Sequence, residues 1–160
     1  MEKTEIIKSK FLDRDELERK LAYWRFKTYK IVFTNGCFDI IHRGHIEYLA
    51  QARNKGDILI VGLNTDASVS RLKGAGRPIN PQEARAMVLA SLFFVDAVVL
   101  FDEDTPYELI KAIQPDVLVK GADYKSEDIV GYDIVTAKGG TVETVELVEG
   151  FSTIKIVERH

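Results

Sequence analysis

Short apolar runs alternate with amphipathic helical stretches along most of this 160-residue chain, and this alternation limits the folds open to it. The apolar runs are continuous, which is typical of strands buried on both faces of a parallel sheet. The pattern predicts strands at residues 31–33, 58–63, 97–100, 116–119 and 141–147, and helices at 13–27, 44–55, 66–72, 81–93 and 105–113. A short last helix capped by Ser152 is also expected. Right-handed crossovers then give an α/β, Rossmann-like, doubly wound parallel sheet of five strands.

The length of the chain fits a single domain. Residues 1–29 are expected to form an N-terminal helical extension, and residues 30–160 the sheet domain. Asp13 and Glu16 have the spacing of a capping box, and Leu17, Leu21 and Trp24 follow at helical spacing. The extension is therefore predicted to pack one apolar face on the sheet domain.

Composition excludes several classes of function. The chain has 22 Lys and Arg against 25 Asp and Glu, for a net charge of −3, which argues against a general nucleic-acid binder. Its apolar runs are too short to cross a bilayer, so no membrane partner is expected. The single cysteine, Cys37, excludes an internal disulfide and fits a reducing compartment, so we expect a cytoplasmic protein.

A motif with phosphate-binding character follows the first predicted strand. Gly36 allows a tight turn there, and the next helix is expected to begin near Gly44. Its free N–H groups and positive dipole end would then face the carboxyl ends of the strands, where such sheets bind ligands. His42 and His45 lie three residues apart at this helix start, so both imidazoles could donate to one anionic group.

A histidine pair at this spacing has two other interpretations. A metal site would need further ligands, but the third histidine is the last residue, His160, and no Cys or acidic cluster lies near the pair. A purely structural pair remains possible, and phosphate chemistry is favoured over both. The chain contains neither G-x-G-x-x-G nor G-x-x-x-x-G-K-[ST], which argues against a dinucleotide oxidoreductase and a P-loop protein.

The motif is similar to the G-x-F-D…H-x-G-H signature of the nucleotidyltransferase superfamily that includes the cytidylyltransferases. Its residues here are Gly36-Cys37-Phe38-Asp39 and His42-Arg43-Gly44-His45; further matches are Asn64-Thr65-Asp66, Arg71-Leu72-Lys73-Gly74, Arg77-Pro78-Ile79-Asn80, Arg85, Lys120-Gly121-Ala122-Asp123-Tyr124 and Gly150-Phe151-Ser152-Thr153. Residues 30–158 closely resemble the D-glycero-β-D-manno-heptose 1-phosphate adenylyltransferase family. The chain departs from the family pattern at Ala122, where the family has Gly, and at Ile154, where it has Thr.

The resemblance implies a reaction and a set of site residues. AMP would pass from ATP, accompanied by Mg²⁺, to a sugar 1-phosphate by direct in-line displacement, giving ADP-heptose and pyrophosphate for lipopolysaccharide synthesis. The expected catalytic residues are His42, His45 and Lys73; the expected nucleotide-binding residues are Asn35, Gly36, Cys37, Phe38, Gly44, Asp123, Ser152 and Thr153; Arg77 and Arg85 are expected to contact phosphate or substrate, and Asp39 to orient the first loop. The resemblance also implies that Arg85 braces the site. Arg71 is a weaker candidate, and Cys37 is interpreted as packing rather than reactive. No metal ligand is expected.

Some alternatives stay open at this point. The chain could be another nucleotidyltransferase of the same fold, making a CDP-alcohol or adenylylating phosphopantetheine or a flavin. It could also be a silent nucleotide-binding module or, less in keeping with its repeated strand-end motifs, a pure interaction domain. The glycerol-phosphate cytidylyltransferases carry an Arg shortly before the Ser-Thr pair, and none stands between Leu147 and Ser152, which argues against CTP. The resemblance also suggests a homodimer, with the helix of Trp24 as a possible interface.

Overall fold

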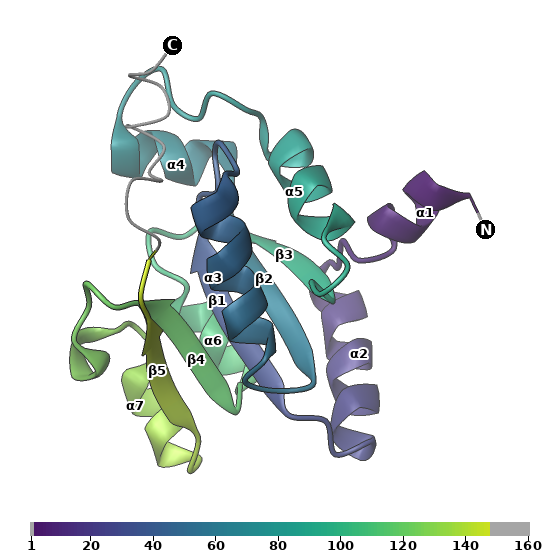
Figure 1. The fold of residues 1–160 in the computed structure, drawn as a ribbon, viewed down its shortest axis with the longest axis vertical. Helices are drawn as coiled ribbons and strands as arrows, with labels where there is room; N and C mark the ends of the chain where they lie inside the picture. Colours follow the sequence, from purple (N-terminus) through teal and green to yellow (C-terminus); the bar gives the residue numbers. More distant parts are fainter. Residues whose placement is uncertain (1, 148–160) are drawn as a thin grey trace.

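The computed structural model describes residues 2–147, so the predicted last helix with Ser152 and Thr153 lies outside the described residues. Figure 1 shows a twisted sheet with helices packed on both faces. The strands are β1 (Ile31–Gly36), β2 (Ile58–Asn64), β3 (Ala97–Phe101), β4 (Val117–Gly121) and β5 (Thr141–Val145). The helices are α1 (Lys3–Lys8), α2 (Arg14–Phe26), α3 (Arg43–Arg53), α4 (Asp66–Lys73), α5 (Gln82–Ser91), α6 (Tyr107–Ile113), the 3-10 turn η1 (Ser126–Asp128) and α7 (Tyr132–Ala137).

All five strands are parallel and lie in the order β3-β2-β1-β4-β5. The chain therefore winds outward from β1 to one edge and returns to wind toward the other, which confirms the doubly wound α/β prediction. The carboxyl ends of β1 and β4 lie side by side at the point where the strand order reverses, and such a point is where open α/β sheets bind ligands.

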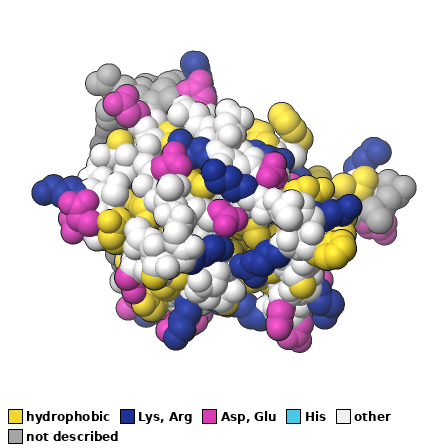
Figure 2. Space-filling model, turned by 90° about the horizontal axis from the view of Figure 1, so that it is seen from below, with side chains coloured by type: hydrophobic (Ala, Val, Ile, Leu, Met, Phe, Trp, Pro, Cys, Tyr) yellow, Lys and Arg dark blue, Asp and Glu magenta, His cyan; other side chains and the backbone are white. Residues whose placement is uncertain are grey.

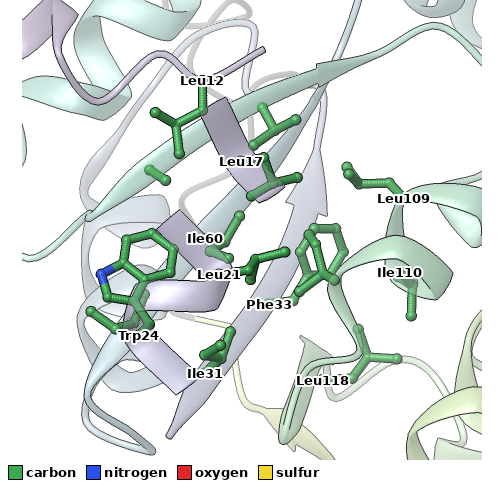
Figure 3. Packing of buried hydrophobic residues seen from close by; sticks show 14 of the residues in the cluster. Leu12, Leu17, Leu21, Trp24, Ile31, Phe33, Ile60, Leu109, Ile110 and Leu118 are labelled. Carbon is green, nitrogen blue, oxygen red and sulfur yellow. The ribbon is translucent and has the colours of Figure 1, made fainter. Parts of the chain in front are cut away.

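Alternate side chains of each strand enter one of two apolar layers. Ile31 and Phe33 of β1 face a cluster that includes residues of α2, α6 and α7 (Figure 3). Val32 faces the opposite cluster, which includes residues of α3 and α5. Because both faces of β1 to β4 are buried, these strands have the largely apolar sequences from which they were predicted; in the edge strand β5, of sequence TVETV, only Val145 is buried.

The N-terminal extension shares this core. Leu17, Leu21 and Trp24 of α2 are buried in the same cluster as β1. The chain just before α2 also pairs with the edge strand β3, where the Leu12 amide donates to the Val98 carbonyl at 3.1 Å. Trp24 is only 7% exposed and packs inside its own chain, so its side chain belongs to the core, and the suggested role of its helix in a dimer interface stays a prediction.

The element boundaries differ from the predictions mainly where helices are short. Helices α1 and α7 have six residues each, and neither was predicted. In α7 only Val135 is buried, so the sequence lacks the repeated apolar positions that predict a helix. The packing of Val135 against the core stabilises this helix instead. Pro81 was expected as the first helical residue of α5, but it is the residue before it. Strand β5 ends at Val145, two residues earlier than predicted.

The end of the molecule that carries the amino ends of the strands has a mixed surface. Figure 2 views it and shows Lys and Arg interspersed with Asp and Glu, with no histidine in sight. At this end Lys138 pairs with Asp116 at 3.3 Å, and the Asp57 carboxylate accepts from the Lys30 amide. Within residues 2–147, no helix is both long and apolar enough to cross a lipid bilayer.

Candidate active site

A hollow of about 350 Å³ opens at the carboxyl ends of β1 and β4. We call it the main hollow. Its lining residues are Asn35, Gly36, Cys37, Phe38, Asp39, His45, Tyr48, Lys73, Lys120, Gly121, Asp123, Tyr124 and Leu147. It therefore brings together eight of the residues predicted from sequence, which come from the first loop and from α3, α4 and the turn after β4. His42, Gly44, Arg77 and Arg85 lie outside this lining, and their contacts are described below.

The first loop is built around the contact of Gly36 with Phe38. A β-carbon at Gly36 would lie 2.9 Å from Phe38 Cε2, so a larger residue at this position requires the ring to move. Phe38 itself has a positive φ of 46° and is buried. Its ring meets the ring of His45 edge to face, with centroids 5.4 Å apart. Phe38 therefore supports the position of the His45 imidazole.

Both histidines cap the start of α3. His42 is the residue before the helix, and its Nδ1 accepts from the Gly44 amide at 3.1 Å. In return, Nδ1 of His45 accepts from the His42 amide at 3.3 Å, and the two rings lie 3.8 Å apart. Histidine thus takes both side-chain positions of a capping box here, where Ser or Thr and Glu are usual.

This arrangement fixes the chemistry of the two rings. Burial lowers the pKa of His42, and burial, with smaller effects from His42 and Lys73, lowers the pKa of His45 to about 4. Both imidazoles are therefore neutral near pH 7. Because each Nδ1 accepts a hydrogen bond, the neutral ring carries its proton on Nε2, where it can donate. The sequence alone did not determine this protonation state.

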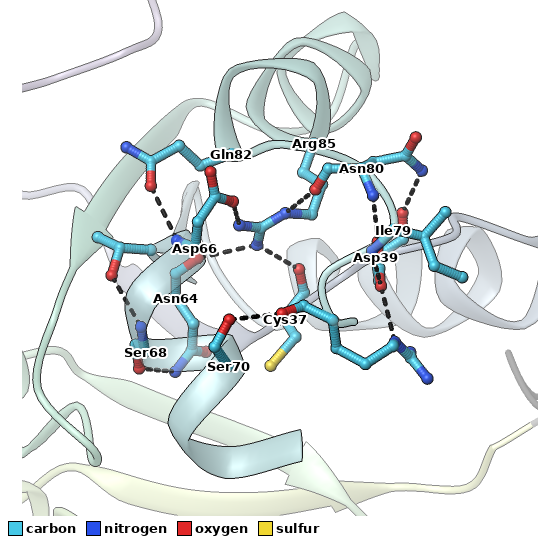
Figure 4. A network of polar contacts seen from close by, with 12 residues as sticks. Cys37, Asp39, Asn64, Asp66, Ser68, Ser70, Ile79, Asn80, Gln82 and Arg85 are labelled. Atoms are coloured by element: carbon cyan, nitrogen blue, oxygen red, sulfur yellow. Dashed lines mark hydrogen bonds and ion pairs between the residues drawn. The ribbon is translucent and has the colours of Figure 1, made fainter. Parts of the chain in front are cut away.

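Asp39 ties the first loop to the segment before α5. It is 4% exposed, and its carboxylate accepts from the amides of Ile79 and Asn80 at 2.8 Å each and from Arg77 Nε at 3.1 Å (Figure 4). Asn80 Nδ2 donates back to the Asp39 carbonyl at 2.7 Å. These bonds lower the pKa of Asp39 although burial opposes them. The expected orienting role thus acts on two loops together.

Arg85 occupies the centre of the same network in Figure 4. Its guanidinium donates to the carbonyls of Asn80, Cys37 and Asn64 and to Asp66 Oδ1, all between 2.7 and 2.9 Å. The side chain is 0% exposed. The expected contact of Arg85 with phosphate therefore has no room in this arrangement, and the residue braces three segments around the hollow instead.

Three further cations lie between residues 71 and 77, and only Lys73 lines the main hollow. Lys73, the last residue of α4, lines the main hollow, as expected of a phosphate ligand. Arg77 holds Asp39 and does not line the hollow. Arg71, already the weaker candidate, pairs with Asp104 at 3.0 Å on the surface. Sequence spacing could not separate these roles, because the partner carboxylates come from distant segments.

Five residues of the hollow were not among the predicted site residues: Tyr48, Lys120, Gly121, Tyr124 and Leu147. Tyr48 lies one turn after His45 on α3, and its hydroxyl contacts Thr34 Oγ1 at 2.9 Å and the Val119 carbonyl at 3.1 Å. Lys120 ends the apolar strand β4, and its Nζ donates to the Asn35 carbonyl at 3.3 Å. Helical spacing from His45, and a lysine at the carboxyl end of a buried strand, were the signals available for Tyr48 and Lys120.

Burial controls the titration of the reactive groups in the hollow. It lowers the pKa of Lys120, against the opposing charge of Asp123. It raises the pKa of the Cys37 thiol, which agrees with a packing role for that residue. Among the described residues, no group of three His, Cys, Asp or Glu is arranged to hold a metal ion.

Comparison with known proteins identifies the family. The sequence model described as cytidylyltransferase-like matches residues 33–159, from the strand before the first loop almost to the end of the chain. The chain belongs to the cytidylyltransferase-like family. The match covers most of β1 and all of β2 to β5, including the capping histidines and the turn after β4.

Relatives and solved structures agree with this assignment. The chain is 56% identical to the bifunctional protein HldE of Wolinella succinogenes and 57% identical to that of Caulobacter vibrioides, each over 94% of this chain and 31% of the relative. It thus spans about a third of the length of these relatives. A lipopolysaccharide core biosynthesis protein from Thermoplasma volcanium is 29% identical, with a TM-score of 0.61 over 75% of this chain and 97% of that one. A pantoate-beta-alanine ligase from Francisella tularensis shares the fold, at 15% identity and a TM-score of 0.62 over 93% of this chain and 76% of that one.

Proposed function

We propose that this chain is an adenylyltransferase that transfers AMP from ATP to a sugar 1-phosphate, D-glycero-β-D-manno-heptose 1-phosphate, releasing pyrophosphate. The observation that carries the proposal is the pair of neutral imidazoles capping α3, whose tautomers put N–H donors on Nε2 beside a hollow that also holds Lys73 and Lys120. Relatives named HldE, bifunctional proteins with this segment at 56% and 57% identity, support the choice of reaction and acceptor.

The reaction joins two anions, so the first task of the site is to hold both. A phosphate oxygen of the acceptor attacks the α-phosphorus of ATP, the bond to the bridging oxygen breaks, and pyrophosphate leaves with that electron pair. The attacking phosphate is already ionised at pH 7, so no general base is required. Positioning of two reactants can supply roughly 7–11 kcal/mol of barrier reduction.

The second task is to stabilise charge as it develops. His42 and His45 donate from Nε2 to the α-phosphate and bridging oxygens, and Lys73 contacts the triphosphate. Neutral donors suit this task because the helix capping already holds them in place, so they need no reorganisation during the reaction. The turn residues Gly121 and Asp123 line the hollow on the β4 side, where the nucleoside would lie. Ser152 and Thr153 remain proposed ligands of the nucleotide.

Mg²⁺ is proposed to enter with the triphosphate. Asp39 in the hollow is already bound to three donors, so few carboxylate oxygens are available to hold a metal. This donor set fits an ion held by phosphate oxygens and water, as Mg²⁺ usually is in nucleotide sites. When bound, the ion neutralises charge on the phosphates. The chain itself contributes Lys73, His42 and His45 as donors around the phosphates.

The test is a panel of nucleotides and phosphorylated acceptors scored by pyrophosphate release. Heptose 1-phosphate with ATP should give the highest kcat/KM, and CTP, phosphopantetheine and FMN should be poor substrates. Highest activity with a different pair would replace the proposed substrates with that pair. Tight ATP binding in calorimetry without pyrophosphate from any acceptor would favour a silent nucleotide-binding module. A homodimer, proposed from the family resemblance, is tested by light scattering of the same sample.

A further inference from the structure

A second, smaller hollow adjoins the main one and was not foreseen from the sequence. We call it the side hollow; its volume is about 170 Å³, and it is lined by Asn35, Asp104, Thr105, Pro106, Lys120, Tyr124, Asp128, Ile129 and Val130. Three of these residues, Asn35, Lys120 and Tyr124, also line the main hollow. The two hollows therefore share one wall, at the carboxyl ends of β1 and β4.

The two hollows differ in size and in charge. A volume of 170 Å³ is below the range of roughly 300–1,000 Å³ for sites that bury a drug-sized ligand, so a whole nucleotide is too large for the side hollow. Its lining also includes Asp128, Asp104 and Thr105. Carboxylates repel a polyphosphate, but they accept hydrogen bonds from hydroxyl groups. The lining thus suits a small, uncharged group that is rich in hydroxyls.

Lys120 stands on the shared wall. Its Nζ lies 3.3 Å from the Asn35 carbonyl and 5.4 Å from the centre of the Tyr124 ring. These two contacts hold the lysine side chain in place. The ammonium is the only Lys or Arg group that the described residues contribute to the side hollow. An anionic group of a ligand seated there is therefore drawn to this wall, which faces the main hollow.

We propose that the side hollow binds the polyhydroxyl part of the acceptor, with the acceptor's phosphate held by Lys120 at the wall shared with the nucleotide. The inference rests on the proposed function and adds to it the residues that select the acceptor. Asp128 and Thr105 bind sugar hydroxyls, and Asp104 adds a further carboxylate, already held in place by Arg71. A sugar bound this way points its phosphate toward the α-phosphorus in the main hollow.

Steady-state kinetics of three variants test the proposal. Asp128→Asn replaces a charged hydrogen-bond acceptor of the protein with a neutral amide. It should raise the KM for heptose 1-phosphate by roughly tenfold to a hundredfold. Thr105→Trp fills the side hollow from an exposed position and should abolish saturation by the acceptor. Both should leave the KM for ATP within about twofold, because ATP occupies the other hollow. Glu127→Gln is the matched control. Glu127 is the neighbouring carboxylate of the same 3-10 turn, but its side chain lines neither hollow.

The outcomes separate this inference from the proposed function. Unchanged acceptor KM in both test variants of an enzyme that does use sugar 1-phosphates would overturn the side hollow alone. A parallel rise of the KM for ATP would overturn it too, since the variants would then have disturbed the whole site. Wild-type preference for an acceptor without sugar hydroxyls would overturn the proposed function and this inference together. A thermal unfolding midpoint equal to that of the wild type shows that each variant is folded in the assay.

Discussion

His42 and His45 each use one ring nitrogen to cap α3. Nδ1 of each ring holds a backbone amide at the start of α3, so the proton of the neutral ring is on Nε2. A substitution can keep the cap while displacing the donor, because Gln carries its N–H groups on a flexible amide and not on the fixed ring position of Nε2. Gln at the third position of a capping box accepts the same amide bond as His45 does here.

We expect His45→Gln to lower kcat about a hundredfold or more while leaving the unfolding midpoint near that of the wild type. The magnitude follows from the roughly 2.7–4 kcal/mol that one oxyanion donor contributes in other enzymes. Pyrophosphate release measures the change, and Glu47→Gln, an exposed residue two positions along α3, is the control expected to keep full activity. Near-normal turnover in a folded His45→Gln protein would refute the assigned role.

The depressed pKa of His45 also predicts a pH dependence of stability. In the unfolded chain a histidine titrates near pH 6.5, whereas the folded protein lowers the pKa of His45 to about 4. Between these values the unfolded state binds the extra proton, so the free energy of unfolding falls as pH drops from about 6.5 toward 4. At pH 5 the loss from this residue is about 2 kcal/mol.

Urea unfolding at pH 7 and pH 5 measures this effect. His45→Gln lacks the titrating group, so it should lose less stability than the wild type over this interval, by about 2 kcal/mol. Equal losses in the two proteins would mean that the folded structure does not depress the pKa of His45. The comparison between the two proteins cancels the contributions of the carboxylates that titrate in the same interval.

At the scale of elements, Arg85 connects the first loop, the end of β2, the start of α4 and the segment before α5. Arg85→Met removes all four donated bonds and leaves buried carbonyls without partners. We expect a loss of about 3–5 kcal/mol in the free energy of unfolding, because the guanidinium is fully buried. Urea denaturation measures it. Arg71→Met, which breaks an exposed ion pair, should cost less than about 1 kcal/mol. Similar small losses in both variants would contradict the bracing role.

The elements with long apolar patterns were predictable, and the contacts between loops were not. Strands β1 to β4 and helices α2 to α6 followed from their apolar patterns, because both faces of these strands are buried and the helices have one apolar side; β5 was also predicted, although only Val145 of it is buried. The position of the phosphate-binding motif followed from its place after β1. The resemblance implied a bracing role for Arg85, but its partners could not be predicted, because Cys37, Asn64 and Asn80 offer backbone carbonyls that no side-chain pattern records.

The same reason explains the other differences at the site. Lys73 and Arg71 are two residues apart on α4, so they point in different directions, and only the fold determines which one meets a carboxylate. The capping use of both Nδ1 atoms was hidden because histidine is an uncommon choice for a capping box. The side hollow could not be predicted because its walls come from the ends of β1 and β4 and from the connections after β3 and β4.

At the scale of the whole molecule, the first thirty residues and the sheet form one core. The only tryptophan of the chain, Trp24, lies in α2 and is buried with Leu17, Leu21 and residues of β1. An extension that merely docked on a finished domain could melt before it. A shared core should unfold in one cooperative transition, as most single domains of this size do.

We therefore expect Trp24 fluorescence and far-ultraviolet circular dichroism to give the same urea midpoint, although the first reports on α2 and the second on all elements. Leu21→Ala should lower the free energy of unfolding by about 2–5 kcal/mol by both probes, because Leu21 is 4% exposed and its truncation leaves a cavity under β1. Tyr23→Ala, on the exposed side of the same helix, should change it by less than about 0.5 kcal/mol. The extension would be a separate folding unit if the fluorescence midpoint came at a lower urea concentration than the dichroism midpoint, and if Leu21→Ala shifted only the fluorescence midpoint. Coincident transitions that shift together mean that α2 stabilises the strands whose ends form the site.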